Sequence, residues 1–292
     1  MPATFVRDLG SWKQVKTLHV RDAGAWKQVK TAFIRDGGVW KVAFRPTISL
    51  TIAADTTNYN IRNAATAAGW NGVDPVRVEL TINPGIYVGS SSTATPALDT
   101  GIFPSGSEIL ITNNGTIIGR GGNGGAGGSA YGAGITAGAA GGAGGPALKA
   151  TSSCAVINNG TIAGGGGGGG GGGAEVASGE TNDNGWVDYY AGSGGSGGAG
   201  YLTGTGGAAG YAGDGRGNFP GSGGNPGTRT TGGAAVTTTY DGGAGGGPGL
   251  AGAAGQNGPT RAGGAGGTAG AFVQINANVT WQVAGTRFGA VA

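Results

Sequence analysis

The chain has 292 residues, of which 73 are glycine and 11 are proline. One histidine and one cysteine argue against His-based catalysis, a thiolate zinc site and an intrachain disulfide framework. The formal net charge is +3, but residues 1–46 carry +6 and the remainder carries −3. No stretch of 18 apolar residues predicts a membrane-spanning helix, and the first ten residues lack a signal pattern, so we expect synthesis in a cytoplasm.

Three copies of a 14-residue unit fill residues 1–46, each reading strand, Asp-x-Gly turn, strand. Such a hairpin cannot bury a core alone, so we expect a β-meander that packs on something. It is either a small sheet folded on the next domain or an attachment module. In the second case Trp12, Trp26 and Trp40 contact partner subunits, since Trp is enriched at interfaces. The regular charge pattern argues against nucleic-acid binding.

Residues 47–118 predict a small α+β domain. Apolar and polar residues alternate over 47–52, 75–82, 86–88 and 108–111, which is typical of strands. Asn58 can cap a helix from residue 59 to about 68, which Gly69 ends. Trp70 and Tyr87 are expected in the core. No nucleophile has a histidine to serve it, so the sequence predicts no catalytic residue and no enzyme.

Glycine recurs with a period of three between residues 119 and 270, where 60 of the 73 glycines lie. Period three is the repeat of the polyproline-II helix, whose buried N–H and C=O groups must bond to neighbours. Collagen is disfavoured because the runs are short and proline is scarce, and a flexible linker would not keep the phase. We therefore expect a bundle of about eight polyproline-II helices, with residues 164–173, ten consecutive glycines, at its centre.

The motif Asn-Asn-Gly-Thr-Ile occurs at residues 113–117 and 158–162, ahead of two glycine-rich runs. A degenerate third copy at 271–281 predicts that the chain returns to a β base in its last part, residues 271–292. The fold class expected is thus mainly β with a polyglycine/polyproline-II bundle.

The loops between the runs hold most of the aromatic and charged side chains of this region. Rigid runs carrying such loops are similar to a binding paratope. Paired acids such as Glu180 and Asp183 could serve a glycosidase, but a solvated or receptor-facing role fits better. The receptor-binding candidates are Trp186, Asp188, Tyr189, Tyr190, Tyr201, Tyr211, Arg216, Phe219, Arg229 and Tyr240. No metal ligand set and no cofactor are expected.

Together these features resemble the glycine-rich adhesins at the tips of tail fibres in tailed bacteriophages, notably those of T-even-like phages. The resemblance implies a virion protein at the distal tip of a tail or tail fibre, bound to other tail-fibre or tail-tip subunits. It also implies that the loops contact a host outer-membrane protein or surface glycan. The three-hairpin N-terminus departs from the family pattern, so a homotrimer and a single chain on a trimeric fibre both stay open.

Two alternatives belong to other classes. Glycine-rich polyproline-II bundles also resemble springtail antifreezes, which bind ice through flat faces, although bulky charged loops argue against that activity here. The third hypothesis is a purely structural tail component whose loops bind nothing.

Overall fold

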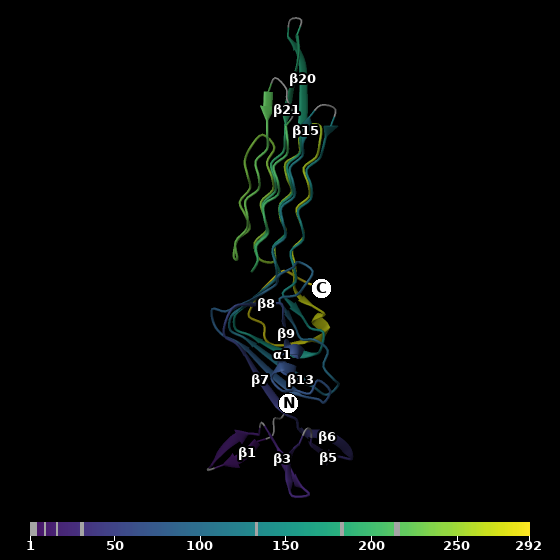
Figure 1. Ribbon diagram of the computed structural model, residues 1–292, viewed down its shortest axis with the longest axis vertical. Helices are drawn as coiled ribbons and strands as arrows, with labels where there is room; N and C mark the ends of the chain where they lie inside the picture. The colour runs from purple at the N-terminus through teal and green to yellow at the C-terminus, as the bar shows by residue number, and fades with distance from the viewer. Residues whose placement is uncertain are drawn as a thin grey trace.

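The computed structural model describes residues 5–8, 10–15, 17–29, 32–131, 134–181, 184–212 and 217–292. The molecule is elongated, with hairpins at one end, a β-structure in the middle and glycine-rich runs at the other end (Figure 1). The fold is mainly β. Within the described ranges the helices are α1 (Ile61–Ala67) and the 3-10 turn η1 (Asn276–Asn278), and neither is long and apolar enough to cross a membrane.

The N-terminal repeats form three separate hairpins. They are β1 (Phe5–Asp8) with β2 (Ser11–Gln14), β3 (His19–Asp22) with β4 (Ala25–Gln28), and β5 (Ala32–Asp36) with β6 (Val39–Phe44). The pairs Ala23–Gly24 and Gly37–Gly38 have positive φ, as two-residue hairpin turns require. Each hairpin is its own two-stranded sheet, so the expected continuous meander does not form among the described strands, and the hairpins diverge (Figure 1).

The middle of the molecule is a three-sided parallel β-solenoid of three five-stranded sheets. The first sheet contains β7 (Thr47–Ile52), β10 (Arg77–Ile82), β13 (Glu108–Asn113), β18 (Cys154–Asn158) and β24 (Val279–Val283). The second contains β8 (Thr56–Thr57), β11 (Tyr87–Gly89), β14 (Thr116–Ile118), β19 (Thr161–Ala163) and β25 (Thr286–Phe288). The third contains β9 (Tyr59–Asn60), β12 (Leu98–Asp99), β17 (Leu148–Lys149), β23 (Ala271–Gln274) and β26 (Ala290–Val291). Each coil contributes one strand to each sheet.

This arrangement differs from the separate α+β domain expected over residues 47–118. The strands of that segment continue in parallel register into residues 148–163 and 271–291. Parallel coils stack because aliphatic side chains of successive strands lie over one another in the core, as Val78 does with Ile109 and Leu80 with Ile111. One coil alone could not bury these side chains, so the solenoid needs the segments that follow the glycine-rich runs.

The Asn-Asn-Gly-Thr-Ile copies are consecutive coils of the solenoid. Asn113 pairs with Asn158, and Thr116 with Thr161, in adjacent parallel strands. The third copy was expected at 271–281, but the register places the next coil at β24 and β25, where Thr286 lies opposite Thr161. Residues 271–274 instead form the third side of the preceding coil.

The only α-helix in the described ranges, α1, begins two residues later than expected. Asn60, not Asn58, is its N-cap, since the Asn60 side chain accepts a hydrogen bond of 3.0 Å from the backbone N–H of Asn63. Asn58 has a φ of 51° and lies in the turn before β9. Gly69, with a φ of 100°, follows the helix and ends it as a left-handed glycine does.

The glycine-rich runs are insertions in two coils of the solenoid. They occupy residues 119–129, 136–146, 164–174, 191–200, 203–212, 220–228, 232–239, 241–248, 250–258 and 262–270. The first two lie between β14 and β17, and the others between β19 and β23. The chain passes back and forth between the solenoid and the distal end, which we define as the end of the runs away from the solenoid (Figure 1).

The run at residues 164–173, the central run, hydrogen-bonds to six neighbouring runs. Its successive N–H groups donate in turn to runs 191–200, 250–258 and 136–146, and its carbonyls accept from runs 119–129, 241–248 and 262–270. A Cβ on any of these ten glycines would lie within 2.3 Å of a neighbouring backbone oxygen. Only glycine therefore fits in this run.

A second buried run, residues 191–200, also hydrogen-bonds to six neighbours. It is not pure glycine, because Ser193 and Ser196 use their hydroxyls to hydrogen-bond to runs 220–228 and 232–239. The Ser193 oxygen lies 2.6 Å from that of Thr238, and the Ser196 hydroxyl donates to the carbonyl of Ala234 at 2.5 Å. A side chain is tolerated at every third position because it replaces a missing backbone contact.

Candidate functional site

The distal end carries a hairpin and a third strand beside it. β20 (Glu175–Thr181) pairs with β21 (Asn184–Tyr190), and β22 (Gly217–Phe219) adds to β21 in parallel. β20 directly follows the run that ends at residue 174, and β21 directly precedes the run that begins at residue 191. The hairpin is therefore anchored on the most extensively hydrogen-bonded part of the bundle.

An aromatic cluster forms where this hairpin leaves the runs. The rings of Tyr190 and Phe219 are stacked, with centroids 4.5 Å apart and planes 2° from parallel. Tyr240 meets Tyr190 edge-on at 6.4 Å. Tyr240 is buried and donates its hydroxyl hydrogen bond to the Glu175 carboxylate, whereas the Phe219 side chain is 43% exposed. One side of the cluster is thus fixed to the bundle and the other faces solvent.

Burial and the Glu175 carboxylate together set the ionisation of Tyr240. Removal from solvent is the larger effect and raises the pKa of the phenol, because it disfavours the charged phenolate. The hydrogen bond to Glu175 and the negative charge of that carboxylate raise the pKa further. The phenol therefore stays protonated and keeps its role as a donor.

A second pair of tyrosines lies at the distal end, one after the first run and the other at the start of the segment that ends in Phe219. The rings of Tyr131 and Tyr211 meet edge-on at 5.8 Å, and the side chains are 52% and 60% exposed. β15 (Ala130–Tyr131) and β16 (Gly134–Ile135) form the first loop, which lies against β20 and β21. Ala130 donates a backbone hydrogen bond of 2.9 Å to the carbonyl of Tyr211, which holds the two loops together.

Most of the expected receptor-binding residues lie at this end. Asp188 and Tyr189 are on β21 and half-buried, and Tyr190, Tyr211, Phe219 and Tyr240 join the two aromatic groups. Trp186 lies on β21 opposite Gly179, and its side chain lies outside what the structure describes. Arg216 falls outside the described residues. Tyr131 was not among the candidates, although it follows a glycine-rich run as Tyr211 does.

Tyr201 and Arg229 lie at the opposite end of the runs, against the solenoid, and not with the other candidates. The Arg229 guanidinium lies 4.7 Å from the ring centroid of Tyr201 and 4.8 Å from that of Tyr87. It also forms an ion pair of 3.2 Å with Asp55. Arg229 and Tyr240 lie only 11 positions apart in the sequence, but the run at residues 232–239 connects the two ends of the bundle, so the two side chains are separated by its length.

A family model described as phage tail fibre adhesin Gp38 matches residues 47–292. The chain belongs to this adhesin family. The adhesin is a component of the phage tail fibre, and this finding favours adhesion over the ice-binding alternative. No curated protein matches the chain.

A solved structure is similar to the adhesin in fold. It is the crystal structure of the gp37–gp38 adhesin tip complex of the bacteriophage S16 long tail fiber. The similarity covers 85% of this chain and 83% of that chain, with 22% identity and a TM-score of 0.53. At that identity the comparison supports the fold alone. The three N-terminal hairpins precede the matched family region, which begins at residue 47.

The hairpins of the adhesin present large apolar side chains to solvent. Trp26 is 71% exposed and Trp40 is 66% exposed, and Phe33 and Ile34 are exposed too. The side chain of Trp12 lies outside the described residues, although its backbone pairs with Arg7 in the first hairpin. Several exposed apolar side chains on one small module are typical of an interaction surface.

Proposed function

We propose that the adhesin binds a receptor on the host bacterial surface, an outer-membrane protein or a surface glycan, through its distal loops. The observation that carries this proposal is the convergence of exposed and half-buried aromatic side chains from three loops on one end of the bundle. Tyrosine and other aromatic side chains supply large contact areas at a low cost in conformational entropy. Aromatic anchors set in a partly desolvated cluster are also the usual centres of binding energy.

The glycine-rich runs make this surface rigid. We infer that they are polyproline-II helices, because the hydrogen bonds from one run to a given neighbour recur at every third residue. The N–H groups of Gly122, Gly125 and Gly128, for example, donate to the central run. A loop whose two ends are held by such runs loses little further freedom on binding. The loops can then vary while the bundle that presents them stays the same.

The opposite end is proposed to attach the adhesin to the fibre. The exposed Trp26 and Trp40, with Trp12 at the equivalent position of the first repeat, are suited to pockets of another tail-fibre subunit. That the similar S16 structure is a complex of gp37 with gp38 supports an arrangement of this kind. We therefore place the chain at the fibre tip, made in the host cytoplasm and added during assembly, with a binding role and no catalytic one.

A loop exchange tests the receptor proposal. Residues 175–190 are replaced by the corresponding loop of another adhesin, and adsorption of the virions to intact host cells is measured. The proposal expects loss or change of host range while the bundle stays folded, which circular dichroism of the purified chain checks. As a matched control, Leu202→Ala alters an exposed turn at the solenoid end of the runs and should leave adsorption unaltered. Unchanged host range after exchange of every distal loop would falsify the proposal.

A second experiment tests attachment. Trp26→Ala and Trp40→Ala together should abolish incorporation into virions, and deletion of residues 1–46 should do the same while the remainder stays folded. Light scattering of the purified chain separates a monomer that docks on a trimeric fibre from a homotrimer. Normal incorporation of the double variant would contradict an attachment role for these side chains.

A further inference from the structure

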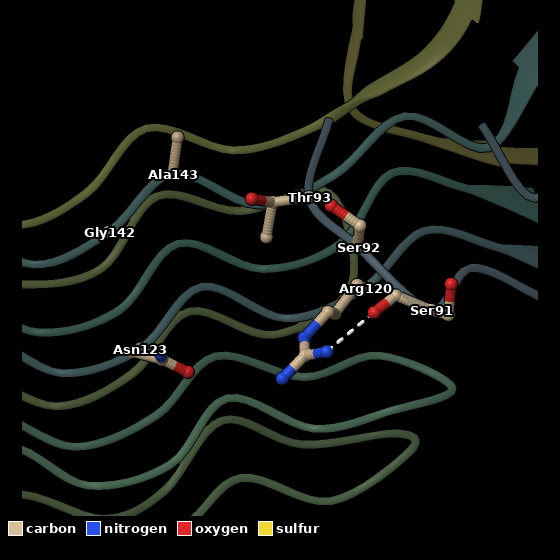
Figure 2. A pocket seen from close by; sticks show the side chains of 7 residues that line it. All are labelled: Ser91, Ser92, Thr93, Arg120, Asn123, Gly142 and Ala143. Carbon is tan, nitrogen blue, oxygen red and sulfur yellow. Dashed lines mark hydrogen bonds between the residues drawn. The ribbon is translucent and has the colours of Figure 1, made fainter. Parts of the chain in front are cut away.

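A polar cavity of about 250 Å³ lies where the runs join the solenoid, far from the aromatic cluster. Its walls come from three segments: the loop after β11, the first run and the second run. The lining residues are Ser91, Ser92, Thr93, Arg120, Asn123, Gly142 and Ala143. Figure 2 shows the Arg120 guanidinium between Asn123 and Ser91, with the side chains of Ser92 and Thr93 on the side of Ala143. The cavity therefore combines one cation with hydroxyl and amide groups.

The Arg120 charge has no acidic partner in the described part of the chain. Its Nη1 donates to the carbonyl oxygen of Ser91 at 2.5 Å, and no carboxylate lines the cavity. A guanidinium has five donors in a planar fork that matches a carboxylate or a phosphate. One bond to a carbonyl leaves most of the donors of that fork available to an anion.

The loop that forms one wall is held in place before any ligand arrives. The buried Ser90 oxygen lies 2.6 Å from the carbonyl oxygens of both Ser92 and Thr95, and Asn58 accepts a hydrogen bond of 3.0 Å from the N–H of Ser91. The loop also packs on the second run, where a Cβ at Gly145 would come within 2.9 Å of the Thr93 Cα. Preorganised polar walls bind a ligand without further ordering cost.

We propose that this cavity binds an anionic monosaccharide unit, one that carries a carboxylate or a phosphate, within a surface polysaccharide. Arg120 would pair with the anionic group, and the hydroxyls of Ser92 and Thr93 with the amide of Asn123 would meet sugar hydroxyls. The volume is below the roughly 300–1,000 Å³ of sites for drug-sized ligands, so it fits one sugar unit. The biological role of such a contact rests on the proposed function, whereas the binding itself does not.

Binding to the full-length chain is measured with defined probes: methyl glucuronoside, glucose 6-phosphate, methyl glucoside and inorganic phosphate. Calorimetry gives the affinities, and the amide NMR shifts of Ser91, Thr93 and Asn123 give the place. We expect methyl glucuronoside to bind at least about tenfold more tightly than methyl glucoside, since its carboxylate adds a charge-assisted hydrogen bond to Arg120. The methyl group blocks C1 as a polysaccharide chain does. Binding of neither anionic sugar would overturn the proposal, whereas binding of glucose 6-phosphate alone would support the phosphate-bearing unit.

Two variants locate the site. Arg120→Gln should weaken methyl glucuronoside binding at least about tenfold, whereas Arg261→Gln, which also removes an arginine bonded to a backbone carbonyl, should not. Ala143→Asp should repel the anion without removing any bond of Arg120. Ala140→Asp, one period along the same exposed run, is its matched control. Equal binding by both members of either pair would refute the assignment.

Three further outcomes decide the ligand class and the independence of the inference. Inorganic phosphate binding as tightly as glucose 6-phosphate would overturn recognition of a sugar. If Arg120→Gln binds methyl glucuronoside normally while exchange of residues 175–190 still changes host range, only the cavity assignment fails. If the cavity binds as expected and no loop exchange alters host range, the receptor proposal fails alone.

Discussion

The side-chain amides of Asn113 and Asn158 form a buried hydrogen bond, Nδ2 to Oδ1, of 2.8 Å across 45 residues of sequence. Asn158 in turn donates to the carbonyls of Ala284 and Thr286 at 2.9 and 3.1 Å. These bonds join three successive coils at the turn between the first two sides of the solenoid. Glycine-rich runs follow this turn in two of the coils. The hydrogen bonds at the turn therefore fix the relative positions of the coils from which those runs start.

Asn158→Ala is expected to lower the free energy of unfolding by about 2–3 kcal/mol, because it leaves buried donors and acceptors without partners. The change is measured by urea denaturation followed by circular dichroism. Asn159→Ala is the matched control, since Asn159 makes a similar 2.9 Å amide bond to Asn114 in an exposed position. Its effect should stay within about 0.5 kcal/mol. Equal losses in the free energy of unfolding for the two variants would show that the buried hydrogen bonds of Asn158 stabilise the fold no more than the exposed bond of Asn159.

Gly168→Ala is expected to prevent correct assembly of the bundle. A Cβ at this position would lie 1.9 Å from the carbonyl oxygen of Asn123, and six neighbouring runs prevent the central run from moving away. Overpacking in a core costs typically about 1–3 kcal/mol where neighbours can shift, and we expect more here. Soluble yield and the melting temperature measure the effect.

Gly223→Ala is the control for this substitution, because its Cβ would meet only the Gly207 oxygen at 3.7 Å. It should be neutral or stabilise by up to about 1 kcal/mol through the unfolded chain. If Gly168→Ala had the same melting temperature as Gly223→Ala, that result would contradict the enclosed position of the central run.

The pattern of glycine in the sequence predicted an enclosed run but not which other runs are buried. Ten consecutive glycines mark residues 164–173, where every direction is blocked. Residues 191–200 are enclosed as well, yet Ser193 and Ser196 hide this from a count of glycines, because their hydroxyls replace bonds between runs. The hydroxyl partners lie in a part of the chain where the glycine phase is irregular.

The solenoid was harder to predict than its individual strands. The long strands, such as β7 and β10, alternate clearly, but β8, β9, β12 and β17 have two residues each, too few to show a period. The register also joins strands on either side of insertions, as β19 pairs with β25 across residues 164–270. Periodicity reports local structure, and such pairing depends on the whole fold.

Whether a loop lies at the solenoid end or at the distal end depends on the number of runs that precede it in the sequence. Irregular glycine spacing between residues 203 and 241 concealed several runs, so Tyr201 and Arg229 were grouped with the distal residues. The same residue types that predict a binding loop also form the contacts that dock a turn on the solenoid. Sequence alone does not separate these two uses of an arginine beside tyrosines.

Arg229→Ala is expected to loosen the docking of the turn at residues 228–231 and to leave receptor binding intact. The guanidinium contacts two rings and Asp55, contacts that together are worth about 1–2 kcal/mol in a partly exposed place. Hydrogen exchange of the N–H of Gly200, which bonds to Thr228, should become faster. Arg229→Lys should restore little of the protection of the Gly200 N–H from exchange, because an ammonium does not stack as the planar guanidinium does.

Host adsorption separates the two roles of aromatic residues. Arg229→Ala virions should adsorb normally, whereas Tyr211→Ala with Phe219→Ala should reduce adsorption at least about tenfold, as loss of aromatic anchors does at interfaces. A defect of equal size in Arg229→Ala virions, with normal exchange at Gly200, would mean that the solenoid end contacts the receptor.

The raised pKa of Tyr240 leads us to expect a loss of stability at alkaline pH. Its pKa is raised above 10, the usual value, chiefly by burial and then by the Glu175 carboxylate. Below pH 10 the phenol is protonated in the folded and the unfolded chain, so the stability it contributes is fully present. Above pH 10 only the unfolded chain releases this proton, and the free energy of unfolding falls by up to about 1.4 kcal/mol per pH unit.

Tyr240→Phe tests this linkage. The variant loses the hydrogen bond to Glu175, so it should be less stable than the wild type at pH 8 by about 1–3 kcal/mol. The difference should shrink between pH 10 and 11, because phenylalanine has no proton to release. Denaturation of both proteins is compared at each pH, and contributions of other groups cancel in the difference. Tyr131→Phe, on an exposed ring at the same end, is the control. A difference that stays constant up to pH 11 would mean that Tyr240 ionises alike in the folded and unfolded chains, and that the cluster at the base of the distal hairpin is open to solvent.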